Sequence, residues 1–142
     1  NITSLYKKLI YYQLKDFNKR IENHENRKLK NIYYLESLKK IKTNKIKLFD
    51  IKDFNYQNFI DFPLLVKNRD KLNNFLLSRG IEARLYYYKN CEKIFKKGMK
   101  FCKNAKKFEN EIICLPNNNQ INLEYIDYII GSISLFFLKK NN

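Results

Sequence analysis

The first forty residues carry apolar side chains at the spacing of a helix. From about Ser4 to Lys40 there is neither proline nor glycine, and apolar residues recur every three or four positions. These apolar positions are Leu5, Leu9, Tyr12, Leu14, Phe17, Ile21, Ile32, Leu35 and Leu38. The pattern predicts one helix about 55 Å long, or two helices broken near His24–Asn26, where polar residues replace apolar ones.

Shorter elements follow a lysine-rich passage at 39–47. In chain order we expect a strand at 58–67, a helix at 69–78, a strand at 81–88, a partly helical segment at 91–110, a strand at 111–116 and a helix from 123 onward. Pro63 favours an edge or a bulge for the first strand, and Gly80 suits the end of the first short helix. The order predicts an α+β (α/β two-layer) domain, in which a long N-terminal helix precedes a small three-stranded sheet covered by helices.

The composition excludes a disordered chain. Hydrophobic residues make up 44% and aromatic residues 15% of the sequence, although the net charge is +15. The charge is concentrated, with thirteen basic and four acidic residues in 1–47, and eight and one in 89–107. Such runs are typical of solvated faces, and phosphate or polyanion binding is the alternative. Only five of the 29 basic residues are arginine, and lysine, asparagine and isoleucine share AT-rich codons, so the charge alone does not indicate a nucleic-acid partner.

The cysteines and the single histidine match no metal or disulfide pattern. Cys91, Cys102 and Cys114 are odd in number, and His24 is far from them in sequence. We therefore expect no metal site, and reduced cysteines as in a cytoplasmic protein. No run of about 20 apolar residues is present, so we expect no membrane span. The chain begins at Asn1 rather than Met, without a basic-then-apolar leader, which favours a fragment or a processed chain.

Four segments share their order and spacing with one enzyme family. They are the first helix with its leucines followed by Arg27 and Tyr34, then DKLNNFLLSRGIEAR at 70–84, CKNAKKFENEIICLP at 102–116 and LEYIDYII at 123–130. Together they resemble the C-terminal part of the DegT/DnrJ/StrS family of PLP-dependent sugar aminotransferases, over about residues 1–138. The resemblance implies the small domain of a fold-type I aminotransferase. It divides the chain into a helical segment at 1–47 that joins a large domain, a small α/β domain at 48–138 and a tail at 139–142.

The resemblance also implies a function for the parent protein. The parent would transfer an amino group from glutamate to a nucleotide-linked keto-sugar in amino-sugar biosynthesis, as a homodimer with PLP. The family's Schiff-base lysine belongs to the upstream large domain, so we expect no catalytic, cofactor-binding or metal residue in this chain. The chain alone would then be inactive. It would present an apolar surface that the large domain and a partner subunit cover.

Two side chains are candidates for the substrate cleft by this resemblance. Arg84 could bind a carboxylate or a sugar phosphate through its bidentate guanidinium, or form a salt bridge to Glu82 or Asp70. Tyr87 matches the family aromatic that lines the cleft, or packs in the core with its hydroxyl at the surface.

The sequence also departs from the family pattern. Tyr6, Lys7 and Lys8 replace small residues of the first helix, and the stretch Tyr86–Glu92 lacks the family's proline and histidine. These departures favour the alternative of a degenerate, non-catalytic structural or interaction module. A basic nucleic-acid-binding domain is a further alternative, and only the charge favours it.

Overall fold

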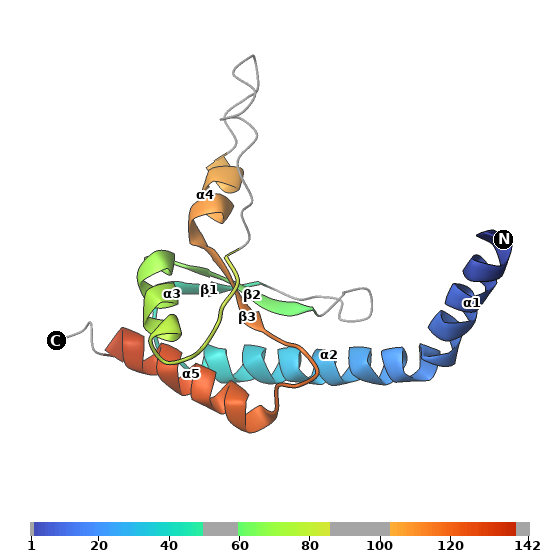
Figure 1. Ribbon diagram of the computed structural model, residues 1–142. Coiled ribbons are helices and arrows are strands. Elements are labelled where there is room, and N and C mark those ends of the chain that lie inside the picture. The colour runs from blue at the N-terminus through green and yellow to red at the C-terminus, as the bar shows by residue number, and fades with distance from the viewer. Residues whose placement is uncertain (1, 50–59, 86–102, 139–142) are drawn as a thin grey trace, which may run out of the picture.

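The structure is a computed structural model that describes residues 2–49, 60–85 and 103–138 (Figure 1). Its helices are α1 (Ile2–Lys15), α2 (Phe17–Lys39), α3 (Arg69–Leu77), α4 (Lys103–Glu111) and α5 (Leu123–Leu138), and its strands are β1 (Ile46–Leu48), β2 (Asp61–Val66) and β3 (Ile112–Pro116). This mixture of helices with a small three-stranded sheet confirms the expected fold class.

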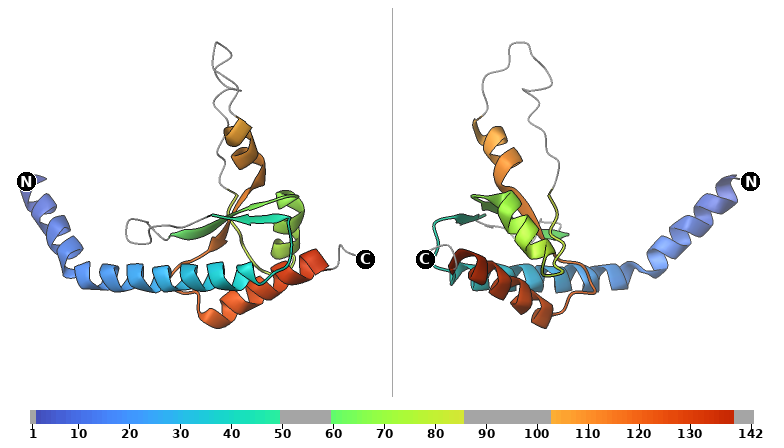
Figure 2. Two further views of the ribbon diagram at one scale, coloured as in Figure 1. Left: turned by 180° about the vertical axis from the view of Figure 1, so that it is seen from behind. Right: turned by 60° about the vertical axis from the view of Figure 1, so that its left-hand side comes forward.

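The long N-terminal helix is divided at Asp16, and not near His24–Asn26 as one alternative held. Asp16 leaves helical geometry at φ −92° and ψ 10°, and its carbonyl accepts a hydrogen bond from Arg20 N at 3.0 Å. Helix α2 continues through 24–26, because polar side chains without Gly or Pro are tolerated on a solvated helix face. Figures 1 and 2 show α1 leading away from the body of the domain.

The sheet is antiparallel in the order β1-β2-β3. Ile46 pairs with Val66, and Phe62 pairs with Leu115. Strands β2 and β3 confirm the strands expected at 58–67 and 111–116. Strand β1, however, lies in the passage that we took as a lysine-rich connection.

The strand expected at 81–88 was wrong over its described part. Within residues 81–85 the backbone forms a single isolated bridge between Arg84 and Cys114. Arg84 N donates to Cys114 O at 2.8 Å, and Cys114 N donates to Arg84 O at 2.9 Å. The segment therefore touches the free edge of β3 at one point. Residues 86–88 lie outside the described residues.

Pro63 sits in the central strand, yet it removes no bond of the ladder. Its partner Cys114 directs both of its backbone hydrogen bonds to Arg84, away from β2. In an antiparallel pair, Pro63 must then also face away from β3. On that side β1 pairs only as far as Leu64, so Pro63 has a locally free edge, and this reconciles the expected edge position with the observed order.

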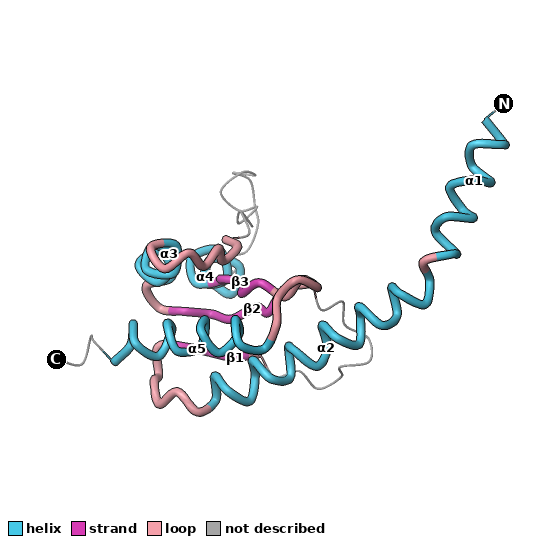
Figure 3. The backbone as a smooth tube through the Cα atoms, turned by 60° about the horizontal axis from the view of Figure 1, so that its bottom comes forward, coloured by secondary structure: helices cyan, strands magenta, loops and turns pink. Residues whose placement is uncertain are grey.

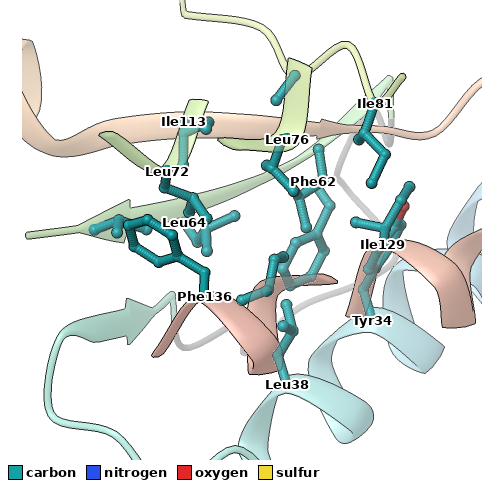
Figure 4. Close-up of a cluster of buried hydrophobic side chains, with 14 of the residues drawn as sticks. Tyr34, Leu38, Phe62, Leu64, Leu72, Leu76, Ile81, Ile113, Ile129 and Phe136 are labelled. Carbon is teal, nitrogen blue, oxygen red and sulfur yellow. The ribbon is translucent and has the colours of Figure 1, made fainter. Parts of the chain in front are cut away.

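One face of the sheet carries the main core (Figure 4). Side chains of α2, α3 and α5 pack there against Phe62, Leu64 and Val66 of β2 and Ile113 and Leu115 of β3. On the other face, Leu65, Ile112 and Cys114 form a smaller buried cluster with Phe49. Helix α3 ends at Leu77, and the turn after it contains Gly80, whose φ of 73° suits glycine as expected. Ile81 N then donates to Leu76 O at 2.9 Å, which directs the chain towards Arg84.

Candidate functional site

Arg84 lies at the edge of the sheet with its side chain more than half exposed. The Nη1 atom is 3.3 Å from Oδ2 of Asp61, whose own side chain is only 7% exposed. Arg84 therefore pairs with Asp61, rather than with Glu82 or Asp70. Asp70 instead contacts its neighbour Arg69 at 2.8 Å. Because 57% of the Arg84 side chain is exposed, its guanidinium is accessible to a ligand as well as to Asp61.

A shallow polar hollow of about 290 Å³ opens beside Arg84. Its lining comprises Gly80, Glu82, Arg84, Pro116, Asn118, Gln120, Ile121 and Tyr125. Tyr125 Oη donates to the Gly80 carbonyl at 3.1 Å, and Gln120 N donates to Asn118 Oδ1 at 2.9 Å. The hollow thus joins the end of α3, the edge of β3 and the turn before α5, and these bonds hold its rim.

The turn that follows β3 is fixed to α2 by buried amides. Asn117 Nδ2 donates to Asn31 Oδ1 at 2.7 Å and to the Arg27 carbonyl at 2.9 Å, and both asparagines are buried. Lys30 Nζ donates to the Asn118 carbonyl at 3.0 Å. Burial, and then the charge of Arg27, lower the pKa of Lys30. These hydrogen bonds position the rim of the hollow. We did not predict them from the sequence, because each joins two residues that are 86 to 90 positions apart.

Cys114 does not have the properties of a reactive thiol. Burial, and then the charge of Asp61, raise its pKa to about 12. The thiolate is the nucleophilic and metal-binding form, so Cys114 is inert near neutral pH. In the described ranges no three His, Cys, Asp or Glu side chains converge on a possible metal site. None of the described helices has both the length and the hydropathy that crossing a bilayer requires.

The second predicted cleft residue, Tyr87, lies outside the described residues, as does the whole stretch Tyr86–Glu92. The structure therefore places Arg84 at a hollow, but it does not test whether Tyr87 lies at the same hollow. The polar residues that line the hollow with Arg84 include Asn118, Gln120 and Tyr125. Only the resemblance indicated a site at this position, and the turn at 117–122 gave no separate indication of it.

The described residues do not fit PLP. The cofactor requires a lysine amine, a carboxylate for its ring nitrogen and a backbone cradle for its phosphate. Gly80 lies in the turn after α3 and Gly131 lies inside α5, so neither belongs to a phosphate-binding loop. The one described lysine with a lowered pKa, Lys30, uses its ammonium on the Asn118 carbonyl. Within these ranges no amine, carboxylate and phosphate cradle come together.

Comparison with known proteins identifies relatives over nearly the whole chain. The model of the DegT/DnrJ/EryC1/StrS aminotransferase family matches residues 2–134. The dTDP-4-amino-4,6-dideoxy-D-glucose transaminase of Shigella dysenteriae is 31% identical over 86 residues, which cover 54% of this chain and 23% of that protein.

Solved structures share the fold of this chain. A DegT DnrJ EryC1 StrS aminotransferase from Brucella abortus superposes with a TM-score of 0.74 at 23% identity, over 87% of this chain and 33% of its own. The aminotransferase TlmJ from Streptoalloteichus hindustanus gives a TM-score of 0.72 at 15% identity, over 91% of this chain and 35% of its own. The chain thus spans from 23% to 35% of the length of these relatives.

Proposed function

The chain belongs to the DegT/DnrJ/EryC1/StrS aminotransferase family, and on that premise we propose that it is the small domain of a PLP-dependent sugar aminotransferase. The parent polypeptide transfers an amino group from glutamate to a nucleotide-linked keto-sugar, in the cytoplasm. The 31% identity to a dTDP-amino-sugar transaminase supports this substrate class. The lysine, the aspartate and the phosphate loop for PLP come from the large domain of the same polypeptide, since the described residues do not supply them.

The observation that carries this proposal is the uncovered apolar surface of α1. Large apolar side chains are exposed there at Leu5, Tyr6, Leu9, Ile10, Tyr11, Tyr12 and Leu14, and on α2 at Phe17 and Ile21. They occupy more than half of the helix circumference, whereas an ordinary surface helix has one apolar stripe. A contiguous apolar surface of this kind marks an interaction site. We propose that the large domain and a second copy of the polypeptide cover it.

A degenerate structural module is the alternative function. Tyr6, Lys7 and Lys8 stand where the family has small, closely packed residues, and all three are exposed on α1. If no other contacts replace the close packing that small residues give this helix in the family, α1 binds a partner in a protein that has no catalytic role. Both functions require a partner surface, so only activity separates them.

The test is amino transfer by the full polypeptide. The coding sequence upstream of Asn1 is read first, and the full polypeptide is then compared with residues 1–142 for PLP retained after dialysis. Turnover is assayed with glutamate and a dTDP-linked 4-keto sugar. We expect one PLP per full subunit and measurable turnover, with neither for residues 1–142. A full polypeptide that retains PLP but transfers no amino group to any nucleotide keto-sugar would support the degenerate module.

Arg84 gives the proposal a residue-level prediction. In the full polypeptide, Arg84→Gln is expected to raise the KM for the nucleotide sugar at least tenfold, because a hydrogen bond to a charged group contributes about 1.5–3 kcal/mol. The kcat should change little, since the binding is remote from the reacting carbon. Lys71→Gln, which removes a charge from an exposed position of α3, is the matched control. Equal KM values for Arg84→Gln and Lys71→Gln would mean that Arg84 does not bind the nucleotide sugar.

A further inference from the structure

A groove of about 680 Å³ lies between the end of α2 and the outer side of α5. The two helices run side by side there (Figure 3). Its lining comprises Tyr33, Ser37, Lys40, Ile41, Lys42, Thr43, Asp127, Ile130, Gly131, Ser134, Phe137 and Leu138. It shares no residue with the hollow beside Arg84, and its volume is within the range of small-molecule sites.

Three of the residues that line the groove are small. Gly131 has no side chain, and a Cβ built at this position would meet nothing within 4 Å. Ser37 on α2 and Ser134 on α5 are the other small residues along the groove. Because Gly131 is exposed and lines the groove, a larger residue at 131 can be accommodated without displacing the core, and its side chain would narrow the groove.

The two ends of the groove differ in charge. At one end, Tyr33 Oη donates to Asp127 Oδ1 at 2.6 Å, so a phenol occupies this carboxylate oxygen. At the other end, Lys40 and Lys42 extend from the turn after α2. No acidic side chain pairs with either ammonium group among the residues that the structure describes. An anion is therefore attracted to the lysine end and repelled by Asp127.

The lysine end is held in place by backbone bonds. Ile41 N donates to Leu38 O at 3.1 Å, and Thr43 N donates to Ile41 O at 2.9 Å. Lys45 N donates to Thr43 Oγ1 at 3.2 Å. The turn is thus fixed against the helix end, and it presents both lysines beside the groove. Between the two ends, Ile130 is partly buried and Phe137 is buried, which gives the groove an apolar floor.

We propose that this groove binds a small amphiphilic anion. Its charged group lies between Lys40 and Lys42, and its apolar body lies over Ile130 and Phe137. The ligand needs both a charged group and an apolar body. Exposed lysines bind a free inorganic anion only weakly, and a ligand without charge would leave Lys40 and Lys42 unpaired.

The test is calorimetric titration of the full chain with octyl phosphate below its micellar concentration, with inorganic phosphate and octanol as separate arms. We expect octyl phosphate to bind at least tenfold more tightly than either. Gly131→Leu should weaken octyl phosphate at least tenfold while the thermal midpoint is kept or raised, because leucine is the better helix former. Lys40→Gln with Lys42→Gln should weaken octyl phosphate to a similar degree.

Two outcomes would overturn the proposal. Inorganic phosphate that binds as tightly as octyl phosphate would show a site for anions alone. If octyl phosphate binds the Gly131→Leu variant as tightly as it binds the unsubstituted protein, the ligand lies elsewhere, such as on the apolar surface of α1. The matched control is Lys39→Gln with Lys47→Gln, which removes the same charge from two exposed positions outside the groove. It should change the affinity less than twofold.

Discussion

Replacing Tyr34 with alanine is expected to lower the free energy of unfolding by about 4 kcal/mol. Tyr34 has no exposed surface, and its ring stacks on Phe62 with the centroids 5.1 Å apart. Its hydroxyl donates to the Pro116 carbonyl at 3.1 Å. This one side chain therefore connects α2 to β2 and to the end of β3. Alanine leaves a cavity between rigid elements and an unpaired carbonyl, and urea unfolding followed by circular dichroism measures the loss.

The neighbouring residue gives the control. Tyr33 is only partly buried and donates to Asp127, so Tyr33→Ala should lower the free energy of unfolding by about 1 kcal/mol. Tyr34→Phe removes only the hydroxyl and should also lower it by about 1 kcal/mol. If Tyr34→Ala is no more destabilising than Tyr33→Ala, the joint between α2 and the sheet is not where the structure places it.

Tyr34 also gives the stability a pH dependence of known sign. Burial raises its pKa above the ordinary value of 10.0, so the folded protein keeps this phenol protonated where the unfolded chain ionises it. The folded state then binds more protons than the unfolded state above pH 10, and stability falls as the pH rises. Tyr34→Phe should show a shallower decline in the alkaline range.

The helices were the part of the fold that sequence patterns indicated best. Apolar spacing located the N-terminal helical region, the helix after Asn68 and the last helix. The second half of α2, α3 and α5 bury the apolar face against the sheet, whereas the apolar positions of α1 are exposed in this chain. The position of the break between α1 and α2 was wrong, since it was assigned to the polar residues near His24. Polarity alone does not end a helix on a solvated face. At Asp16, the backbone angles depart from the helix, and no apolar pattern indicates such a departure.

The strands were less predictable, because pairing depends on distant partners. Strand β1 has three residues, of which Lys47 points outward between Ile46 and Leu48, and so short an alternation cannot be separated from a loop. Its register is set by Leu64–Val66 of β2. Conversely, the stretch from Ile81, in which Glu82 and Arg84 alternate with apolar residues, was predicted as a strand, but its described part makes one bridge to Cys114.

The site was predictable only at Arg84, and only through the family resemblance. Its partner Asp61 is 23 residues earlier, whereas the partners weighed from sequence, Glu82 and Asp70, were nearer. The Asn31–Asn117 contact spans 86 residues. A hydrogen bond between two ordinary asparagines leaves no spacing or composition to recognise, although both are buried. Tertiary contacts of this kind follow from the fold, and one sequence does not show them.

In the full polypeptide, Leu9→Asp is expected to reduce transaminase activity at least a hundredfold. Leu9 lies within the apolar arc of α1, between Leu5 and Tyr6 on the helix surface, and is exposed in this chain. If the large domain or a second copy covers that arc, the aspartate becomes a buried, unpaired carboxylate. That change is destabilising by several kcal/mol at the interface. Turnover and sedimentation of the full polypeptide measure the loss of activity and of assembly.

The same substitution should leave residues 1–142 almost unaffected. Leu9 is exposed in this chain, so Leu9→Asp should change its free energy of unfolding by no more than about 0.7 kcal/mol, the helix-propensity term. Lys15→Asp is the matched control, because Lys15 is exposed in the last turn of α1. It lies seven residues after Lys8, so the two lysines share a helix face that lacks the large apolar side chains. Lys15→Asp alters the charge more than Leu9→Asp does, so a smaller loss of activity in Lys15→Asp excludes charge as the cause. Full activity in Leu9→Asp would mean that α1 stays exposed in the parent, and the apolar arc would then no longer support docking of the large domain.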